Sequence, residues 1–372
     1  MINPEDFITN DKTNKVLISS LLPNPSSGFP EVSRKKLYDT LKEYLQRKGI
    51  AYEELLNTRD VWCRDYMPVQ ITKNLYLSYT YHPDYLVGLE GTITNWILHK
   101  VHTKKTSQLD LPYKTLPILL DGGNVVKAIN KEEKPTIILC DKILDENHIS
   151  ENDFKDWWKN FFDNDMEFIL LKWDGPEYNP IGHADGIVRY VSPGVVLMTN
   201  YCEFDEKLAE SHRQTLEKHF TVHQLKYEST FSNEDKNEVK LWRLLKGHSW
   251  SYINFLQVGH NILLPRLGYD KLDNSALEQI QHYYGKDFSV ELIDCDMLEI
   301  IAGDGNGSNS GGALNCLTWN IFSNNLTTGN VEKISELLET LPKNGILKEI
   351  TDPVEWQRQQ RDEWETDWKD SK

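Results

Sequence analysis

Residues 310–318 read Ser-Gly-Gly-Ala-Leu-Asn-Cys-Leu-Thr (SGGALNCLT), and they place Cys316 between a glycine-rich segment, Gly303–Gly312, and an apolar run that predicts a strand over Leu317–Phe322. Glycines let the backbone approach a ligand closely and leave the thiol at the tip of a loop. The alternative is ordinary packing, because free cysteines are commonly small buried hydrophobes. A phosphate-binding loop is excluded because Gly-Lys-Ser/Thr is missing, and a calcium loop that began at Asp304 would need a glutamate where Asn315 stands.

Four other short polar segments interrupt the strand pattern. They are Trp62–Asp65, Asp121–Asn124, Gly182–Gly186 and Ser249–Asn254. With Asp65, Asp121, Asp185, Asn254 and Cys316 as markers, the successive intervals are 56, 64, 69 and 62 residues. A spacing of this kind indicates a repeated supersecondary unit that brings polar residues together at one end of a shared axis. Sequence identity between the units is low, so chance spacing stays open as an alternative.

Apolar periodicity between these segments predicts a mixed α/β chain of short units. Strands are expected at Lys15–Leu22, Leu75–Tyr81, Leu116–Leu120, Thr136–Leu139, Phe168–Trp173, Ile187–Val191, Val195–Thr199, Tyr252–Val258, Asn261–Pro265 and Ser289–Ile293. Helices are expected at Glu31–Lys48, Glu151–Phe162, Glu206–His219, Ser275–Tyr284 and Val331–Leu341. No linker or composition break divides the chain, so we expect one domain over residues 1–372.

Composition narrows the class of protein. The chain has 372 residues and a formal net charge of −16, with 39% hydrophobic and 11% aromatic residues. This is ample material for a core. The acidic balance disfavours nucleic acid and anionic membranes as partners and favours a small cationic ligand. The N-terminal residues show neither a secretory signal nor a membrane span, so a cytoplasmic location is expected.

The five cysteines are widely spaced and include no Cys-x-x-Cys pair. They therefore indicate neither a disulfide framework nor a zinc site, and we expect no metal and no cofactor. In the charged C-terminal stretch, Trp356, Trp364 and Trp368 fall on one face of a predicted helical tail at about 345–372. That face would cover the body of the protein or a neighbouring subunit, which leaves a homo-oligomer open.

Two of the polar segments carry candidate acid–base and anchoring groups. His183 and Asp185 stand at i and i+2 in an extended stretch, so an imidazole and a carboxylate would line one wall. Asp65 follows Trp62, whose flat ring suits a cation. The ordinary alternatives are a polar loop at 182–186 and a buried tryptophan beside a surface pair of Arg64 with Asp60.

Asp121 opens an Asp-Gly-Gly-Asn turn after an apolar run. Aspartate and glycine are standard turn residues, so this segment has a purely structural interpretation as well. A thiol, an imidazole and two carboxylates without metal-ligand spacing nevertheless suit attack on a planar cationic carbon whose nitrogens the carboxylates hold. Guanidinium is such an ion, and carboxylates match its fork of donors.

These segments together resemble the guanidine-modifying (pentein) superfamily and, within it, the agmatine deiminase and bacterial-type peptidylarginine deiminase family. The matching pieces are VWCRDYMP (61–68), LDGGN (120–124), GHADG (182–186), SYINF (251–255) and SGGALNCLT (310–318), which occur in the family's order. The resemblance implies a five-bladed α/β propeller of ββαβ modules around a central active site, which also accounts for the approximate 60-residue period.

By the same resemblance, Cys316 looks like the nucleophile and His183 the general acid/base. Asp65 and Asp185 look like the guanidinium anchors, and Trp62 like the aromatic that packs on the substrate's flat end. Two further positions match the family: Asn254 corresponds to a polar active-site residue, and Asp121 to an acidic residue that orients the histidine in some branches.

The chain departs from typical agmatine deiminases in two places. Residues 313–315 read Ala-Leu-Asn where those enzymes carry a further glycine and a histidine beside the cysteine, and their N-terminal Met-Pro-Ala-Glu-like segment is absent before Trp62. The departures concern the substrate's tail. The expected activity is hydrolysis of agmatine to N-carbamoylputrescine and ammonia, with peptidylarginine deimination, amidinotransfer and a non-catalytic binding protein as alternatives.

Overall fold

The computed structural model describes most of the chain up to residue 326. The described part comprises residues 2–24, 31–56, 58, 60–82, 113–173, 175, 182–302, 312–324 and 326. The predicted helix Val331–Leu341, the tail at about 345–372 and most of the glycine-rich segment before Cys316 lie outside it.

The described residues form five small sheets of three strands each. In sequence order the strands are β1 (Lys15–Ser19), β2 (Ala51–Leu55), β3 (Val69–Thr72), β4 (Leu75–Thr80), β5 (Tyr113–Leu119), β6 (Val126–Ile129), β7 (Pro135–Cys140), β8 (Glu167–Leu171), β9 (Val188–Ser192), β10 (Val195–Met198), β11 (Thr221–Gln224), β12 (Leu256–Val258), β13 (Asn261–Leu264), β14 (Ser289–Leu292) and β15 (Thr318–Ile321). The sheet orders are β15-β1-β2, β3-β4-β5, β6-β7-β8, β9-β10-β11 and β12-β13-β14.

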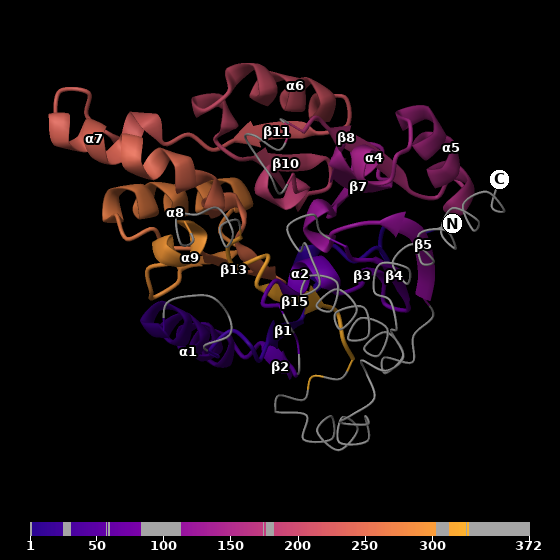
Figure 1. The fold of residues 1–372 in the computed structure, drawn as a ribbon, viewed down its shortest axis with the longest axis horizontal. Coiled ribbons are helices and arrows are strands. Elements are labelled where there is room, and N and C mark those ends of the chain that lie inside the picture. The colour runs from indigo at the N-terminus through magenta and orange to yellow at the C-terminus, as the bar shows by residue number, and fades with distance from the viewer. Residues whose placement is uncertain are drawn as a thin grey trace, which may run out of the picture.

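Every sheet repeats one pattern of pairing. The middle strand pairs antiparallel with the strand before it and parallel with the strand after it. A parallel return needs a crossover, and helices provide it in the four sheets whose crossover the structure describes. They are α1 (Glu31–Arg47), α5 (Glu151–Phe161), α6 (Glu206–Glu217) and α8 (Asp270–Tyr284). Figure 1 shows these helices towards the outside and α2 (Cys63–Tyr66) near the centre. The five-module α/β propeller is confirmed.

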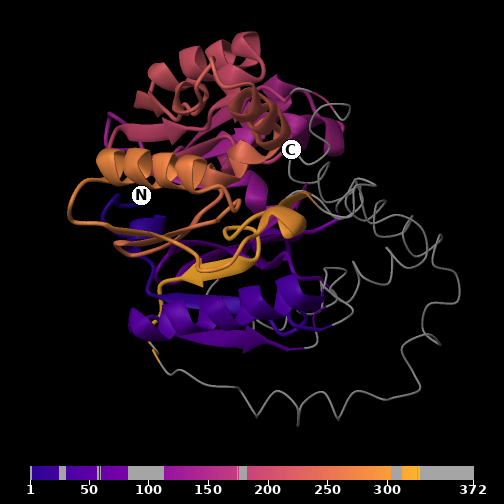
Figure 2. The ribbon, with the colours of Figure 1, turned by 90° about the vertical axis from the view of Figure 1, so that its left-hand side faces the viewer.

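The ring closes across the two ends of the described chain. β15 pairs antiparallel with β1, with Lys15 opposite Ile321 and Ile18 opposite Thr318. In Figure 2 the yellow β15 lies beside the indigo β1 and β2. One module is therefore built from both ends of the ring, so the residues around Cys316 and those after β2 are neighbours in space.

The crossover helices form where the sequence predicts them. α1 turns Leu37, Leu41, Tyr44 and Leu45 inwards at helical spacing. α5 begins after Ser150, whose hydroxyl accepts a hydrogen bond from the backbone N–H of Asp153, and α6 begins after Asp205, which accepts from Leu208 in the same way. Such caps satisfy otherwise unpaired N–H groups of the first turn.

The remaining helices are short connections. They are α4 (Lys142–Glu146), α7 (Lys236–Leu245) and α9 (Leu298–Ala302), with single-turn or 3-10 segments η1 (Asn10–Lys12), η3 (Gly122–Asn124), η4 (Ala184–Gly186), η5 (Tyr201–Glu203), η6 (Glu228–Thr230) and η7 (Lys246–Ile253). No helix in the described ranges combines the length and the apolar character required to cross a bilayer.

The structure differs from the sequence prediction in a few elements. The strand predicted over Tyr252–Val258 is wrong in its first half, because η7 runs to Ile253 and β12 begins only at Leu256. The helix predicted from Ser275 begins earlier, at Asp270. The prediction also missed four strands, β2, β3, β6 and β11, which have only four or five residues each.

Candidate active site

The five polar segments occupy equivalent places in the five modules. Each directly precedes the first strand of its sheet: α2 before β3, η3 before β6, η4 before β9, η7 before β12, and the turn of residues 313–317 before β15. Because those strands run side by side around the centre, the segments that precede them meet at one end of the ring. The repeat therefore brings the candidate residues Asp65, Asp121, His183, Asp185, Asn254 and Cys316 into one buried neighbourhood.

His183 lies between two carboxylates. Its Nε2 is 3.0 Å from Oδ2 of Asp121, and its Nδ1 is 3.7 Å from Oδ1 of Asp65. Burial by itself would lower the pKa of His183, but Asp65, Asp121 and Asp185 outweigh burial and raise the pKa to about 9. The imidazole is thus held as a cation at neutral pH, oriented from both sides.

Asp65 is fixed by the backbone of the neighbouring module. Its Oδ1 accepts a hydrogen bond of 2.9 Å from the N–H of Gly123, and its main-chain carbonyl accepts one from the hydroxyl of Tyr79. A Cβ at Gly123 would lie 2.5 Å from that Oδ1 and 2.6 Å from Nδ1 of His183, so only glycine fits. Burial is the main cause that raises the pKa of Asp65, to about 8; the charge of His183 opposes it.

Cys316 lies beside the other anchor. Its Sγ is 3.5 Å from Oδ2 of Asp185, and the same oxygen accepts a hydrogen bond of 2.6 Å from the side-chain amide of Asn315. Burial, and then the charges of Asp185 and Asp65, raise the pKa of Cys316 well above its ordinary value. Without a bound cation, the sulfur is therefore a thiol.

Asn254 holds the turn that carries the thiol. Its Oδ1 accepts hydrogen bonds from the N–H groups of Ala313 (3.1 Å) and Cys316 (3.3 Å), and its carbonyl accepts one from the N–H of Asn315. The Nδ2 of Asn254 is buried and forms no hydrogen bond of ordinary geometry in the described part of the chain. The side chain of Asn254 nevertheless opposes the rise in the pKa of Cys316, so this amide lies near the sulfur.

Trp62 forms the wall next to Cys316. It is half-buried, and a Cβ at Gly312 would lie 2.3 Å from its ring and 2.9 Å from Cβ of Cys316. Asp60 fixes the start of this segment by accepting the N–H groups of Val61 and Trp62. Close backbone approach at Gly312 thus lets an indole face lie beside the thiol.

The thiol and the imidazole share one electrostatic field. Asp65 raises the pKa of Cys316 as well as that of His183, and Asp185 acts on both groups in the same direction. Three carboxylates, Asp65, Asp121 and Asp185, surround one imidazole; we call them the aspartate cluster. An excess of buried carboxylates around a flat aromatic wall favours a planar cation as the ligand.

Sequence analysis missed three contributions to this site. The N–H of Gly123 and the amide of Asn315 each hold an anchoring aspartate. Arg64 does not form the surface pair with Asp60 considered above: its Nε donates to the carbonyl of Asn315, and its Nη2 donates to Asn320. The only available signal was the position of Arg64 and Asn315 directly beside Asp65 and Cys316 in the sequence.

Candidate metal ligands are not grouped in this region. No set of three histidine, cysteine or carboxylate side chains in the described ranges is arranged to hold a metal ion. The donors that converge on the site are the thiol, the imidazole and carboxylates, each paired with protein groups as described.

Five ββαβ modules around a polar centre define the pentein class of α/β propellers. Within that class, the chain belongs to the Porphyromonas-type peptidyl-arginine deiminase family, whose model matches residues 30–321. The resemblance stated from the five sequence segments is confirmed.

Individual relatives are distant. A Legionella pneumophila protein to which agmatine deiminase activity is provisionally assigned is 22% identical over 223 residues, which are 55% of this chain and 56% of the relative. This chain thus spans about half the length of the curated relatives it matches. The solved structures of the agmatine deiminases of Enterococcus faecalis and C. jejuni each superpose with a TM-score of 0.60 at 16% identity, covering 85% of this chain and 96% of theirs. These likenesses establish the fold.

Proposed function

We propose that this chain is a deiminase that hydrolyses a guanidinium group, with agmatine as the substrate and N-carbamoylputrescine and ammonia as products. The observation that carries the proposal is the arrangement around the thiol. The thiol of Cys316 contacts Asp185. His183 lies between Asp65 and Asp121. The charges of Asp65 and Asp185 act on both the thiol and the imidazole. Family membership and the fold support the same class of chemistry.

Binding of the cation prepares the nucleophile. Asp65 and Asp185 hold nitrogens of the guanidinium through paired hydrogen bonds, and Trp62 packs on its flat face. The positive charge offsets the carboxylates that keep the pKa of Cys316 high. The thiol therefore releases its proton to bulk water when a cationic substrate is present, and it stays protonated in the empty site.

The first chemical step forms a carbon–sulfur bond. The thiolate of Cys316 attacks the central carbon and gives a tetrahedral adduct; imidazolium His183 then donates its proton to the departing nitrogen, the carbon–nitrogen bond breaks, and ammonia leaves. A covalent thiouronium remains on Cys316, and His183 is neutral. The pKa of about 9 keeps this proton on His183 before the step at neutral pH.

The second step returns the enzyme to its starting state. Neutral His183 takes a proton from water, and the resulting hydroxide attacks the thiouronium carbon. The carbon–sulfur bond then breaks, and the hydroxyl proton of the adduct passes to the departing sulfur as the ureido product forms, so Cys316 is again a thiol and His183 an imidazolium. The buried donor Nδ2 of Asn254, which lies near the sulfur, is suited to hold a polar atom of the substrate during both steps.

A side-by-side assay tests this proposal. Agmatine, free arginine and a peptide with an internal arginine are supplied separately, and ammonia and ureido product are measured. Turnover of agmatine is expected, and Cys316→Ala should abolish it while leaving the fold intact, since the side chain is small and buried. Full turnover by Cys316→Ala would remove the thiol from the scheme.

Peptidylarginine deimination is the second candidate, because the family model that matches the chain is named for that activity. Turnover of the peptide in place of agmatine would establish it. Amidine transfer to an added amine, without ureido product, would indicate an amidinotransferase. No turnover of any guanidine by the intact protein would favour a binding protein that keeps the pentein scaffold.

A further inference from the structure

A second polar site lies on the axis of the propeller, next to the aspartate cluster but separate from its reactive groups. It is a cavity of about 30 Å³ whose lining includes Gln70 of β3, Lys127 of β6, Arg189 of β9 and Asn320 of β15. We call it the axial cavity. None of Cys316, His183, Asp65 and Asp185 lines it.

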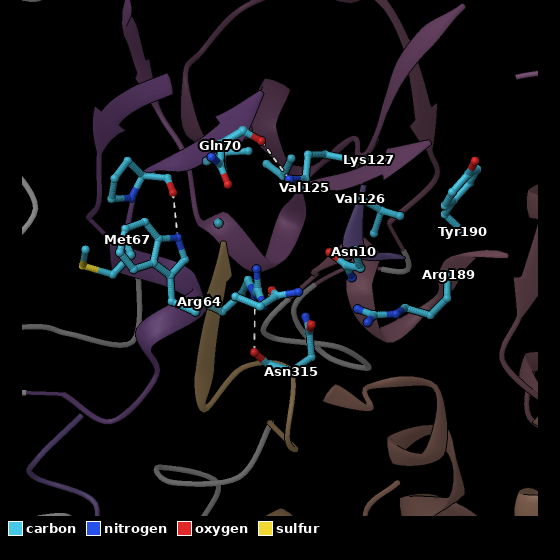
Figure 3. A pocket seen from close by; sticks show the side chains of 15 residues that line it. Asn10, Arg64, Met67, Gln70, Val125, Val126, Lys127, Arg189, Tyr190 and Asn315 are labelled. Atoms are coloured by element: carbon cyan, nitrogen blue, oxygen red, sulfur yellow. Dashed lines mark hydrogen bonds between the residues drawn. The ribbon is translucent and has the colours of Figure 1, made fainter. Parts of the chain in front are cut away.

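Side chains from different modules converge on the axial cavity. Figure 3 shows Arg64 and Arg189 extending towards its centre from opposite sides, with Lys127 and Gln70 above them. The first strands of the sheets are tied together across it: Lys127 donates to the carbonyl of Gln70 over 2.7 Å, and Asn320 donates to the carbonyl of Gln257 in β12. Hydrogen bonds between modules therefore fix the positions of the side chains that line the cavity.

The charged groups of the lining all have one sign. Arg64, Lys127 and Arg189 line the cavity, and no aspartate or glutamate does. Within the described ranges, none of these three cations forms an ion pair. This lining contrasts with a chain whose net charge is −16.

Neutral acceptors satisfy only part of the donor capacity. Arg189 is 3% exposed, and its Nη2 donates to the carbonyl of Phe255 over 3.1 Å with its guanidinium 4.5 Å from the ring of that residue. Arg64 donates to the carbonyl of Asn315 and to Asn320. A guanidinium carries five N–H groups and stays charged in proteins, so both arginines keep donors for a further acceptor.

Leaving these charges uncompensated is costly. Arg189 is buried, whereas Arg64 and Lys127 are partly exposed. Buried charges normally have a counter-ion, so the cost is greatest at Arg189. Asp185 acts on both Arg64 and Arg189 from the neighbouring site, and Asp11 acts on Lys127. Neither carboxylate belongs to the cavity lining, so neither supplies an acceptor inside it.

We propose that the axial cavity is a binding site for a small inorganic anion, held by Arg64, Lys127 and Arg189, with chloride as the probe. The cavity of about 30 Å³ has room for such an ion. Its charged lining groups are cations without a carboxylate, which favours a negative ion. Water alone would fill the space but would place no negative charge in contact with the three cations.

Thermal unfolding of the full chain tests the proposal. Chloride replaces gluconate at constant ionic strength, and the pH is kept below about 7, where burial has lowered the pKa of Lys127. The Tm of the wild-type protein should rise with the logarithm of the chloride concentration above the dissociation constant, by about 2 °C at ten times that constant. Lys127→Met should lose most of this rise, and the exposed control Lys155→Met should keep it.

Bromide provides a second measurement that needs no variant. Crystals of the wild-type protein soaked in bromide should give an anomalous peak inside the axial cavity, which decides the question if Lys127→Met fails to fold. Equal Tm values in chloride and gluconate, or a full chloride effect in Lys127→Met, would overturn the proposal. A bromide peak without any effect in solution would also overturn it, as binding at crystal concentration only.

Discussion

The aspartate cluster and the axial cavity are adjacent, and they collect charge of opposite sign. Asp65, Asp121 and Asp185 face the thiol side, whereas Arg64, Lys127 and Arg189 face the axis. Both arise from the same repeat, since one set precedes the first strands of the modules and most of the other lies within or beside them. The aspartates therefore lie just before the first strand of a module, whereas Lys127 and Arg189 lie within such a strand.

Asn315 lies where the two regions meet. Its side-chain amide donates to Asp185, and its carbonyl accepts a hydrogen bond from Arg64. The neighbouring cations offset part of the negative field that the carboxylates create, because Asp185 and Asp65 both act on Arg64. A buried cluster of carboxylates is less costly where cations lie directly behind it.

Among the substitutions discussed here, the largest loss of kcat/KM is expected when Asp65 loses its charge. Asp65→Asn keeps an acceptor for the N–H of Gly123 but removes the negative charge opposite both His183 and the guanidinium. Loss of one partner from a buried charge pair costs roughly 2–5 kcal/mol, so kcat/KM for agmatine should fall on the order of 10³-fold. Steady-state ammonia release measures it.

The control for Asp65→Asn is a comparison of its thermal unfolding with that of the wild type. Because the fold raises the pKa of Asp65 to about 8, the carboxyl contributes most to stability while it is protonated, and that contribution is lost as the pH rises through about 8. The variant should therefore unfold no earlier than the wild type above that pH. Wild-type turnover in a well-folded Asp65→Asn protein would separate the aspartate cluster from the chemistry.

The pH dependence of turnover is the next largest effect. Cation binding needs ionised Asp65, whose pKa is about 8 in the empty site, and ammonia release needs protonated His183, whose pKa is about 9. The two groups titrate together, so kcat/KM should follow a bell that rises about tenfold per pH unit below about 8 and falls above about 9. Asp65→Asn should lose the part of the rising limb that Asp65 contributes and keep the part that comes from loss of the Cys316 proton, and a flat wild-type profile from pH 6 to 9 would contradict the coupled pair.

Much of the fold was predictable because several elements carry strong local signals. The helix at Glu31–Lys48 was predicted from apolar spacing and is observed as α1, one residue shorter. β3 and β6 were missed for a physical reason. Each has four residues, and Gln70 and Lys127 line the axial cavity, so these buried strands do not show a run of apolar side chains.

The error at Tyr252–Val258 has a different origin. This stretch is apolar enough to predict a strand, but Asn254 bonds three backbone N–H groups of residues 313–316 and bends the chain before β12. Those partners are about sixty residues away in the sequence. Contacts of this kind, like the bond from Asn315 to Asp185 across 130 positions, cannot be read from local pattern.

The smallest effect is expected at the residue that joins the two charged regions. Asn315→Ala removes the hydrogen bond to Asp185 and keeps the backbone carbonyl that Arg64 uses. A hydrogen bond to a charged group contributes about 1.5–3 kcal/mol, so kcat/KM should fall roughly 10- to 100-fold. Asn315 positions Asp185 and is not expected to touch the substrate, so Asn315→Gln, which retains an amide donor, should recover part of the loss. An unchanged kcat/KM with unchanged Tm would mean that Asp185 holds its place without this bond, and that the two charged regions are joined only through Arg64.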